Sequence, residues 1–399
     1  MNESIAPLHG VTVVEIGVFM AAPFATMQLA DLGARVIKIE NPVGGDQTRS
    51  TGPFINGESS PFARLNRNKE SVALDLKTEE GREALWDILE EADVLVENLR
   101  PGALSRLGFS FDNASQRLPQ LIYASGSGWG QDGPLAPLPG LDIMAQARSG
   151  MMSVTGFPGM PPAKVGVPIC DLTTGLYLAL GITAALHERN RSGRGQHLDV
   201  SLLEAGVSYA IWEAGVFFAN GTVSGPHGSA HAHQAPYQAL LCADGYATVG
   251  ANTDGLWRSL AQALDLGHLI DDPRFRTTTD RVTNRDALIE ALENRTKTMT
   301  AEELVAVVNA AGVPSAPILD YGQVFTDPHL TQREFFWDSD HEVMGPVRQI
   351  GSPMRFSRTP TVRRAAGPVL GADTDAVLQQ MARSTENQPV GTAHHTEGS

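Results

Sequence analysis

Cysteine is scarce in this sequence. Only Cys170 and Cys242 occur among 399 residues, which excludes a disulfide framework, and no CxxC pair of the kind that binds zinc is present. Proteins of the reducing cytosol rarely contain disulfides, so this composition predicts a cytoplasmic protein. The first ten residues, MNESIAPLHG, also lack the basic and apolar regions of a signal peptide, and none is expected.

Positive charge is limited as well. The chain has 30 Lys and Arg against 45 Asp and Glu, and its formal net charge of −15 excludes double-stranded nucleic acid as a partner. Long apolar runs are missing: Gly, Thr, His or Glu interrupt each run before it reaches the roughly 20 residues that span a bilayer. No membrane partner is therefore expected.

The common nucleotide and hydrolase motifs are absent. Neither GxxxxGK[ST] nor GxSxG occurs, which excludes a P-loop and a serine nucleophile elbow. The turn after the first predicted strand reads GVFMAAP, with Met20 and Pro23 where a dinucleotide site has glycines. Although Glu40 ends the second strand where a ribose-binding acid would lie, this turn argues against a nicotinamide cofactor.

The first third of the chain alternates regularly between strand and helix patterns. Strands are predicted at 10–17, 34–40, 71–76, 93–98 and 120–128, and helices at 21–33 and 78–92. A longer helix is predicted at 171–189, followed by a turn, a strand and a helix over 193–206. Alternation at this short spacing predicts a doubly wound parallel α/β domain, and we place its N-terminal part at 1–203.

The pattern changes after residue 203. A linker is predicted at 204–224, and an Asp-Gly turn within 239–251 indicates a β-hairpin. Helical patterns follow it, so we predict a smaller α+β domain at 225–317. The polar tail at 384–399 is predicted to be disordered.

Basic residues gather in the first domain, several of them at the ends of predicted strands. They are Arg35, Lys38, Arg49, Arg64, Arg67, Lys69, Lys77, Arg100 and Arg106. Ligands of open α/β sheets bind beyond the carboxyl ends of the strands, so cations there are suited to a phosphorylated ligand. Solvated loop charges explain the same pattern equally well, and both interpretations stay open at this point.

Three histidines lie close together in PHGSAHAHQAP. His227, His231 and His233 invite a metal site, but their neighbours are Gly, Pro and Ala and no acidic residue is adjacent. This composition favours a polar loop at a domain junction, and no metal is expected.

Asp171 stands before the apolar helical run in VPICDLTTGLYLALGITAALHER. As an N-cap of a helix beginning at Leu172, it would accept backbone N–H bonds. A helix N-terminus also lowers the pKa of a carboxyl group, so the same residue could serve as an ionised nucleophile on an activated acyl group. The adjacent Cys170 is a rival nucleophile, but its apolar neighbours favour a core position and a raised thiol pKa.

Taken in order, six segments of the chain resemble the family III CoA transferases, the group that includes formyl-CoA transferase and carnitine CoA-transferases. They are PLHGVTVVEIG, LADLGARVIKIENPVGGDQTR, NRNKESVALDLKTEEGREAL, ADVLVENLRPGALSRLG, VPICDLTTGLYLALGITAALHERNRSGRGQHLDVSLLEA and AGVPSAPILDYGQVFTDPHL. The resemblance runs from about residue 8 to 360. It implies a Rossmann-like large domain plus a smaller domain in an obligate, interlocked homodimer, with 318–383 returning to the large domain.

The resemblance also implies the site. The nucleophilic aspartate of the family falls on Asp171, which would carry CoA from an acyl-CoA, with succinyl-CoA as a family-level donor, to a carboxylic acid. Coenzyme A is then a co-substrate, and no permanently bound cofactor is implied. The positions matching CoA contacts are Met20, Ala21, Leu74, Lys77, Asn98, Leu99, Arg100, Arg106 and Asp142. His233 and Gln234 match the place of a loop that shields the site, and Met20 departs from the glutamine of formyl-CoA transferase.

Two alternatives are considered beside transfer. An α-methylacyl-CoA racemase shares this superfamily but needs a histidine before the acid at Asp142, and Leu141 stands there instead. Exchange of an α-proton without an acceptor acid would favour the racemase. A CoA-binding protein without turnover would bind CoA equally well after Asp171→Ala.

Overall fold

The computed structural model describes residues 5–386 and divides the chain into two compact units. Unit 1 is built from the segments 1–151, 165–211 and 331–399, and unit 2 from 152–164 and 212–330. The predicted tail at 384–399 lies outside the described residues, apart from 384–386 at the end of α17 (Thr374–Glu386).

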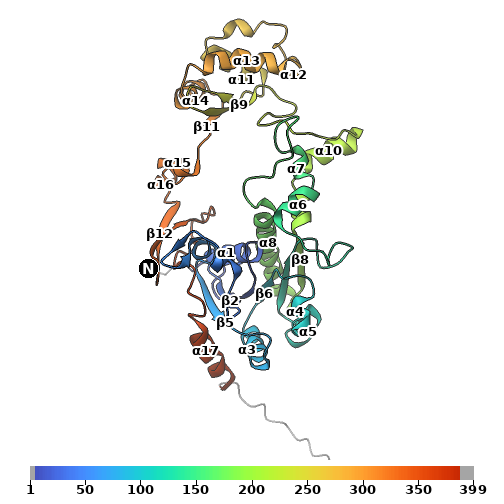
Figure 1. The fold of residues 1–399 in the computed structure, drawn as a ribbon, viewed down its shortest axis with the longest axis vertical. Coiled ribbons are helices and arrows are strands. Elements are labelled where there is room, and N and C mark those ends of the chain that lie inside the picture. Colours follow the sequence, from blue (N-terminus) through green and yellow to red (C-terminus); the bar gives the residue numbers. More distant parts are fainter. Residues whose placement is uncertain (1–4, 387–399) are drawn as a thin grey trace, which may run out of the picture. The chain divides into compact units, whose positions relative to one another are not determined.

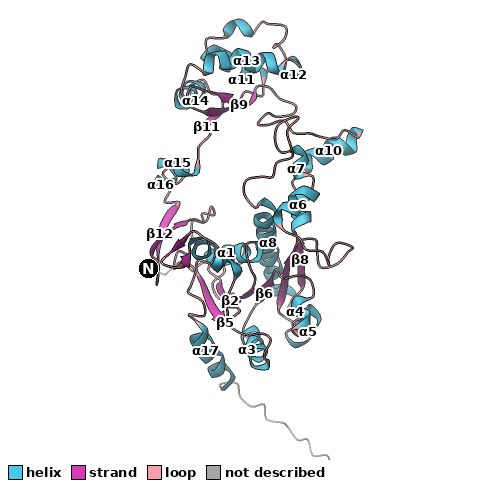
Figure 2. Cartoon of the chain, viewed as in Figure 1, coloured by secondary structure: helices cyan, strands magenta, loops and turns pink. Residues whose placement is uncertain are grey.

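A six-stranded parallel sheet forms the centre of unit 1 (Figures 1 and 2). Its strands are β1 (Thr12–Ile16), β2 (Arg35–Glu40), β5 (Lys69–Ala73), β6 (Val94–Glu97), β7 (Ile122–Ser127) and β8 (His197–Ser201). Their order is β5-β2-β1-β6-β7-β8, so the direction of strand addition reverses between β1 and β6. Val13 lies in register with Val36 on one side and with Val94 on the other. The predicted parallel α/β architecture is confirmed.

Helices cover both faces of this sheet because the strands are apolar on both sides. On one face, α1 (Ala21–Asp31) and α8 (Ile169–Ser192) bury Ala25 and Ile182 against Val13. On the other face, Ile88 and Val377 pack over Val14. The helices of that second face are α3 (Glu79–Glu90), α4 (Ala103–Arg106), α5 (Phe111–Arg117) and α17.

Helix α8 is long and apolar enough, by length and composition, to cross a membrane. The expectation that no segment reaches this length was wrong, because Gly175 and Thr173 do not interrupt the helix. Half of its apolar stretch is buried, and a Cβ at Gly175 would lie 2.8 Å from the Ala21 carbonyl oxygen, so glycine permits close packing on α1. The burial identifies α8 as a core helix of unit 1.

Shorter elements complete unit 1. They are β3 (Phe54–Ile55), β4 (Glu58–Ser59), η1 (Gln47–Ser50), α2 (Ser60–Leu65), α6 (Asp142–Arg148), α9 (Leu202–Val207), and the antiparallel pair β12 (Phe336–His341) and β13 (Gly345–Ile350). The C-terminal segment is fixed to the sheet, since the Asp373 carboxylate accepts a bond from the Ser71 backbone N–H at 2.8 Å. Helices α7 (Met151–Val154) and α10 (Ile211–Asn220) lie at the boundaries between the units.

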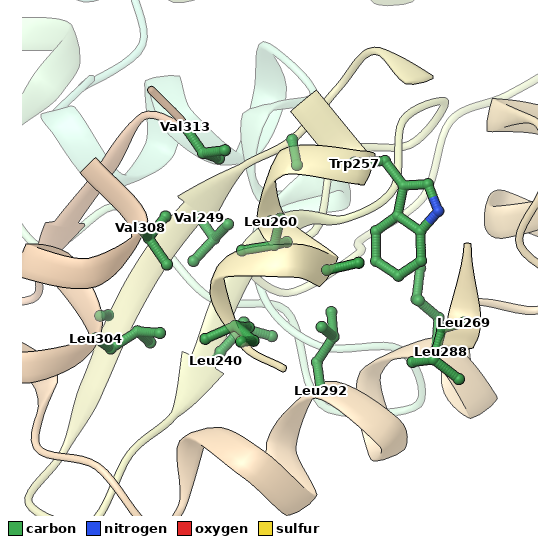
Figure 3. Close-up of a cluster of buried hydrophobic side chains, with 14 of the residues drawn as sticks. Leu240, Val249, Trp257, Leu260, Leu269, Leu288, Leu292, Leu304, Val308 and Val313 are labelled. Carbon is green, nitrogen blue, oxygen red and sulfur yellow. The ribbon is translucent and has the colours of Figure 1, made fainter. Parts of the chain in front are cut away.

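Unit 2 holds a three-stranded antiparallel sheet in the order β11-β10-β9. Its elements are β9 (Tyr237–Leu241), β10 (Tyr246–Gly250), α11 (Asp254–Ala263), η2 (Gly267–Leu269), α12 (Thr278–Thr283), α13 (Arg285–Thr296), α14 (Ala301–Ala310), β11 (Ser315–Pro317) and α15 (Tyr321–Val324). Helix α16 (Pro328–Gln332) spans the point at which the chain returns to unit 1. The predicted hairpin is confirmed as β9 and β10. Trp257, Leu260 and Leu292 belong to the core between this sheet and its helices (Figure 3).

Candidate active site

Asp171 lies in the first turn of α8, which begins at Ile169. The prediction that the helix begins at Leu172 with Asp171 as its N-cap was wrong. Pro168 occupies the N-cap and has no hydroxyl or carboxylate to accept a bond. Asp171 is therefore inside the helix, and its side chain does not serve as the cap.

The cap comes from another helix. Asp142, the first residue of α6, accepts the Cys170 backbone N–H at 2.9 Å and the Asp171 backbone N–H at 3.4 Å through Oδ1. Its Oδ2 accepts a bond from the Gln146 amide at 2.6 Å, which fixes the carboxylate. Asp142 thus satisfies N–H groups at the start of α8 that the helix itself leaves without acceptors.

Burial raises the pKa of the Asp171 carboxyl group to about 7, and the nearby charge of Asp142 contributes to the rise. The expectation that the helix N-terminus lowers this pKa was wrong, because the loss of hydration outweighs the helix dipole. A carboxyl group with this pKa is about half ionised at neutral pH. It is more basic than an ordinary carboxylate and therefore a better nucleophile.

Cys170 is fully buried, and its pKa is raised to about 11, first by burial and then by the charges of Asp142 and Asp171. It packs with Ala21, Ala145 and Leu202. The predicted core position is confirmed, and a thiol with this pKa supplies almost no thiolate at neutral pH.

Asp142→Asn is expected to extend activity toward lower pH. The introduced asparagine keeps an oxygen for the Cys170 N–H but removes the negative charge that raises the pKa of Asp171. With Asp171 expected to react in its ionised form, the rate should fall below about pH 7 in the wild type, and the pH of half-maximal rate should be lower by up to about one unit in the variant. Single-turnover rates across this range measure the shift. Glu83→Gln, at an exposed acid on α3, is the control, and an unmoved Asp142→Asn midpoint would contradict the coupling.

Five of the nine clustered cations form ion pairs within the fold. Lys38 is fully buried between Glu15 at 2.6 Å and Asp46 at 2.9 Å. The other pairs are Lys69 with Glu15, Arg49 with Glu40, Arg67 with Asp31, and Arg35 with Glu70. For these residues both open interpretations were wrong, because structural carboxylates already neutralise their charge. Among the described residues, no carboxylate pairs with Lys77, Arg100 or Arg106 within ion-pair distance.

A cavity of about 310 Å³ lies at the carboxyl ends of β1, β2, β5 and β6, where the strand order reverses. Leu74, Lys77 and Leu99, three of the predicted CoA contacts, line it together with Gly17 and Asn41. Ligands of open α/β sheets bind at such a reversal. This cavity, hereafter the larger cavity, therefore has the position expected of a nucleotide site.

The predicted CoA contacts that do not line the larger cavity are found in α1, α4 and the segment after β6, apart from Asp142, which is described above. Met20 and Ala21 begin α1, and the Ala21 side chain touches the cluster around Cys170. The Asn98 side chain accepts the Val18 N–H and donates to the Val18 carbonyl, both at 2.8 Å, and so holds the turn before α1. Arg100 lines a smaller cavity of about 190 Å³. Arg106 ends α4.

His233 and Gln234 belong to unit 2. The guanidinium of Arg285 donates to the His231 carbonyl at 2.6 Å and to those of Ala232 and Gln234 at 3.4 Å, which fixes the backbone of this segment. Among the described residues, no group of three or more His, Cys, Asp or Glu side chains is placed to hold a metal ion.

Sequence analysis missed two groups of residues near the site. One is the pair of buried acids that neutralise Lys38, namely Glu15 within β1 and Asp46 at the N-cap of η1; neither position indicates in the sequence that the acid is paired. The other is Glu97, Ser125 and His197, three polar side chains on adjacent strands. Their pairing depends on the strand order, which only the structure gives.

Comparison with known proteins supports one family over the whole chain. The family model described as CoA-transferase family III matches residues 8–374. The chain is 38% identical over 352 residues to an acetyl-CoA:oxalate CoA-transferase from Acetobacter aceti, across 88% of this chain and 89% of that protein. It is 35% identical over 385 residues to the succinyl-CoA:glutarate CoA-transferase of Mus musculus, across 96% and 88%.

A solved structure supports the same family. The crystal structure of a CAIB/BAIF family protein from Brucella suis matches with a TM-score of 0.87 and 37% identity, across 94% of this chain and 100% of that chain. The full-length match, the shared fold and the curated transferases together assign the chain: it belongs to CoA-transferase family III.

Proposed function

We propose that Asp171 is the nucleophile of this acyl-CoA:carboxylate CoA-transferase. The observation that carries the proposal is a partly buried carboxyl group at the start of α8, whose pKa of about 7 leaves about half of it as an unusually basic carboxylate at neutral pH. Asp142 fixes the backbone around it through Cys170 and Asp171. An aspartate is suited to the reaction because its acyl derivatives are energetic enough to regenerate a thioester.

The reaction then runs through Asp171 in two half-reactions. An Asp171 oxygen attacks the thioester carbonyl, the carbon–sulfur bond breaks, and CoA thiolate leaves a mixed anhydride. The thiolate attacks the aspartyl carbonyl, which releases the donor acid as a carboxylate and forms an aspartyl-CoA thioester. The acceptor carboxylate attacks this thioester and expels the thiolate again. Attack of the thiolate on the acceptor's acyl carbon gives the new acyl-CoA and restores Asp171.

The CoA moiety is proposed to bind at the carboxyl edge of the sheet. Leu74 and Leu99 give the larger cavity apolar walls, and Lys77 adds a positive charge at its rim. Arg100 and Arg106 are further cations suited to the phosphates of CoA. Asn98 bonds Val18 and so fixes the turn before Met20 and Ala21. This turn connects the larger cavity, which Val18 lines, with Ala21, which packs against Cys170 beside Asp171. His233 and Gln234 are proposed to shield the intermediates.

We further propose dicarboxylate chemistry, with succinyl-CoA as donor. Curated relatives with this donor include the succinyl-CoA:glutarate enzyme of mouse and a succinyl-CoA:mesaconate CoA-transferase of Haloarcula hispanica, which is 33% identical. Both acceptor names denote dicarboxylic acids. None of these relatives is named as a racemase or as a protein without turnover, and Leu141 offers no proton-transfer group.

An interlocked, cytoplasmic homodimer is proposed as the working form, with functional domains at 1–203, 225–317 and 318–383 and a linker at 204–224. Large apolar side chains on α10 support it: Trp212 is 81% exposed and Phe218 83% exposed in the single chain. Leu176 and Leu180 of α8 are exposed as well. Exposed apolar side chains of this size are typical of protein interfaces. Light scattering that gives the mass of one chain, 42.6 kDa, would contradict the dimer.

The covalent intermediate can be trapped directly. The protein is incubated with succinyl-CoA, hydroxylamine is added, and the modified peptide is mapped by mass spectrometry. Hydroxylamine cleaves an aspartyl anhydride or thioester and leaves a hydroxamate, so we expect this modification on Asp171 and on no peptide of the Asp171→Asn variant. An unmodified Asp171 during active turnover would contradict the mechanism.

A further inference from the structure

A short segment separates the larger cavity from the smaller cavity that Arg100 lines. Leu99 lines the larger cavity, whereas its neighbours Glu97 and Arg100 line the smaller one. Helix α4 and the residue after it continue the division, with Leu104 facing the smaller cavity and Leu107 the larger. The segment 97–100 is therefore a thin wall, and any movement of it changes the shape of the larger cavity.

Glu97 holds this wall from the side of the smaller cavity. It ends β6, is buried, and accepts the Leu99 backbone N–H through Oε2 at 2.8 Å. The residue between them, Asn98, forms two hydrogen bonds through its side chain with the backbone of Val18. These three bonds together fix the wall at Leu99 and the turn after β1 at Val18. Both belong to the lining of the larger cavity.

The carboxylate of Glu97 is in turn held by the next two strands. Glu97 lies in register with Ser125 of β7, whose hydroxyl donates a hydrogen bond to it. The Ser125 Oγ lies 3.0 Å from His197 Nε2 on β8, and the His197 ring stacks on Phe111 with its centroid 5.1 Å away. With neutral His197 donating, the bonds run in one direction: His197 to Ser125, Ser125 to Glu97, and Leu99 to Glu97. A carboxylate at Glu97 accepts both bonds more strongly than the neutral acid does.

We propose that Glu97, held by Ser125 and His197, is a positioning residue that fixes the wall 97–100 for CoA binding and strengthens that binding when it ionises. This role rests on the proposed function of the larger cavity as the CoA site. Glu97 does not line the larger cavity, so it acts through Leu99 and Asn98 rather than by touching the substrate.

Burial raises the pKa of Glu97 to about 7, while the bonds from Ser125 and the Leu99 N–H lower it and the charge of Asp199 raises it. The residue therefore changes charge in the neutral range. Titratable and charged side chains around it are Arg100 on the wall, Asp112 on α5, Tyr123 on β7, and His197 and Asp199 on β8. The pKa of His197 is lowered by burial, which keeps its ring neutral when Glu97 is ionised.

The test compares CoA affinity in wild type and Glu97→Gln as a function of pH, with free CoA as the titrant in calorimetry. Glutamine has nearly the same shape and resembles protonated Glu97, so the two dissociation constants should agree near pH 5.5. Near pH 8.5 the variant should bind about 10-fold more weakly, because it lacks a charged hydrogen-bond acceptor. The ratio of the two constants cancels the titration of CoA and of Asp171, which both proteins share.

Two further variants test whether the pH dependence of CoA affinity comes from the charge of Glu97. Asp199→Asn removes a charge that raises the pKa of Glu97, so the pH at which affinity changes should fall. Glu90→Gln, an exposed acid paired with Arg117, is the matched control and should leave the affinity unchanged. A Glu97→Gln to wild-type ratio that is the same at every pH would overturn the proposal, as would an unmoved midpoint in Asp199→Asn. Failure of the wild type to bind CoA at any pH would instead contradict the proposed function.

Discussion

Replacing Asp171 with asparagine is expected to lower CoA transfer by about 10⁴-fold or more, the scale seen when a covalent nucleophile is removed. Asparagine has nearly the same shape, but its amide does not attack a thioester to form an anhydride. Steady-state transfer from succinyl-CoA to a panel of carboxylic acids measures the loss. Free CoA should still bind, since the larger cavity lies beyond the carboxyl ends of the strands and is not lined by Asp171.

Cys170→Ala is the neighbouring control for this prediction. Cys170 is buried and only packs with Ala21, Ala145 and Leu202, so this variant should keep its transfer activity within a few fold. An inactive Cys170→Ala protein of normal stability, together with an active Asp171→Asn protein, would assign the chemistry to the thiol.

The same Asp171→Asn variant should be more stable than wild type at alkaline pH. The pKa of Asp171 is raised to about 7 in the folded protein, so its favourable contribution to folding is complete below about pH 4 and is lost as the pH rises through 7. Thermal unfolding should show equal stability near pH 4 and a higher Tm for the variant at pH 8. A higher Tm of Asp171→Asn at pH 8 would also show that the inactive protein is correctly folded.

Glu15→Gln should lower the free energy of unfolding at pH 7 by about 3–5 kcal/mol, the cost of breaking a buried ion pair. Glu15 is fully buried and bonds Lys38 at 2.6 Å and Lys69 at 2.8 Å. Burial opposes its charge, but the two ammonium groups lower its pKa to about 2. Asp46 still neutralises Lys38 in the variant, so Lys69, whose pKa is lowered to about 8 mainly by burial, is left without a counter-charge.

Urea unfolding measures this loss of unfolding free energy, and its pH dependence shows whether ionised Glu15 is the stabilising form. Because the folded pKa of Glu15 is depressed, its stabilising contribution is complete above about pH 4.5 and is lost as the pH falls toward 2. Glu70→Gln, which breaks the half-exposed pair with Arg35, is the control and should cost less than about 1 kcal/mol. Equal losses in the two variants would show that burial does not govern the effect.

Much of the fold could be predicted because it depends on local patterns. Apolar β-branched runs locate β1, β2 and β6 within one or two residues. The start of α8 was placed three residues late, because its cap, Asp142, is distant in sequence and leaves no mark beside Pro168. A helix whose cap comes from another element looks uncapped in its own sequence.

The site was predictable in part for a related reason. Asp171 could be found from the segments around it, but its acidity could not, since burial and the charge of Asp142 depend on packing. The cations Lys38, Arg49 and Lys69 looked available for a phosphate until the structure showed carboxylates against them. Residue type gives the charge of a side chain, whereas the partner that neutralises it is a property of the strand order.

The capping of α8 by Asp142 has a mechanical consequence. One carboxylate both holds the backbone of Cys170 and Asp171 in place and sets part of the acidity of Asp171. Its helix, α6, presents the exposed apolar side chains of Leu141, Ile143 and Met144 on either side of it. A displacement of α6 would therefore change two properties of Asp171 at once, the position of its backbone and the acidity of its carboxyl group.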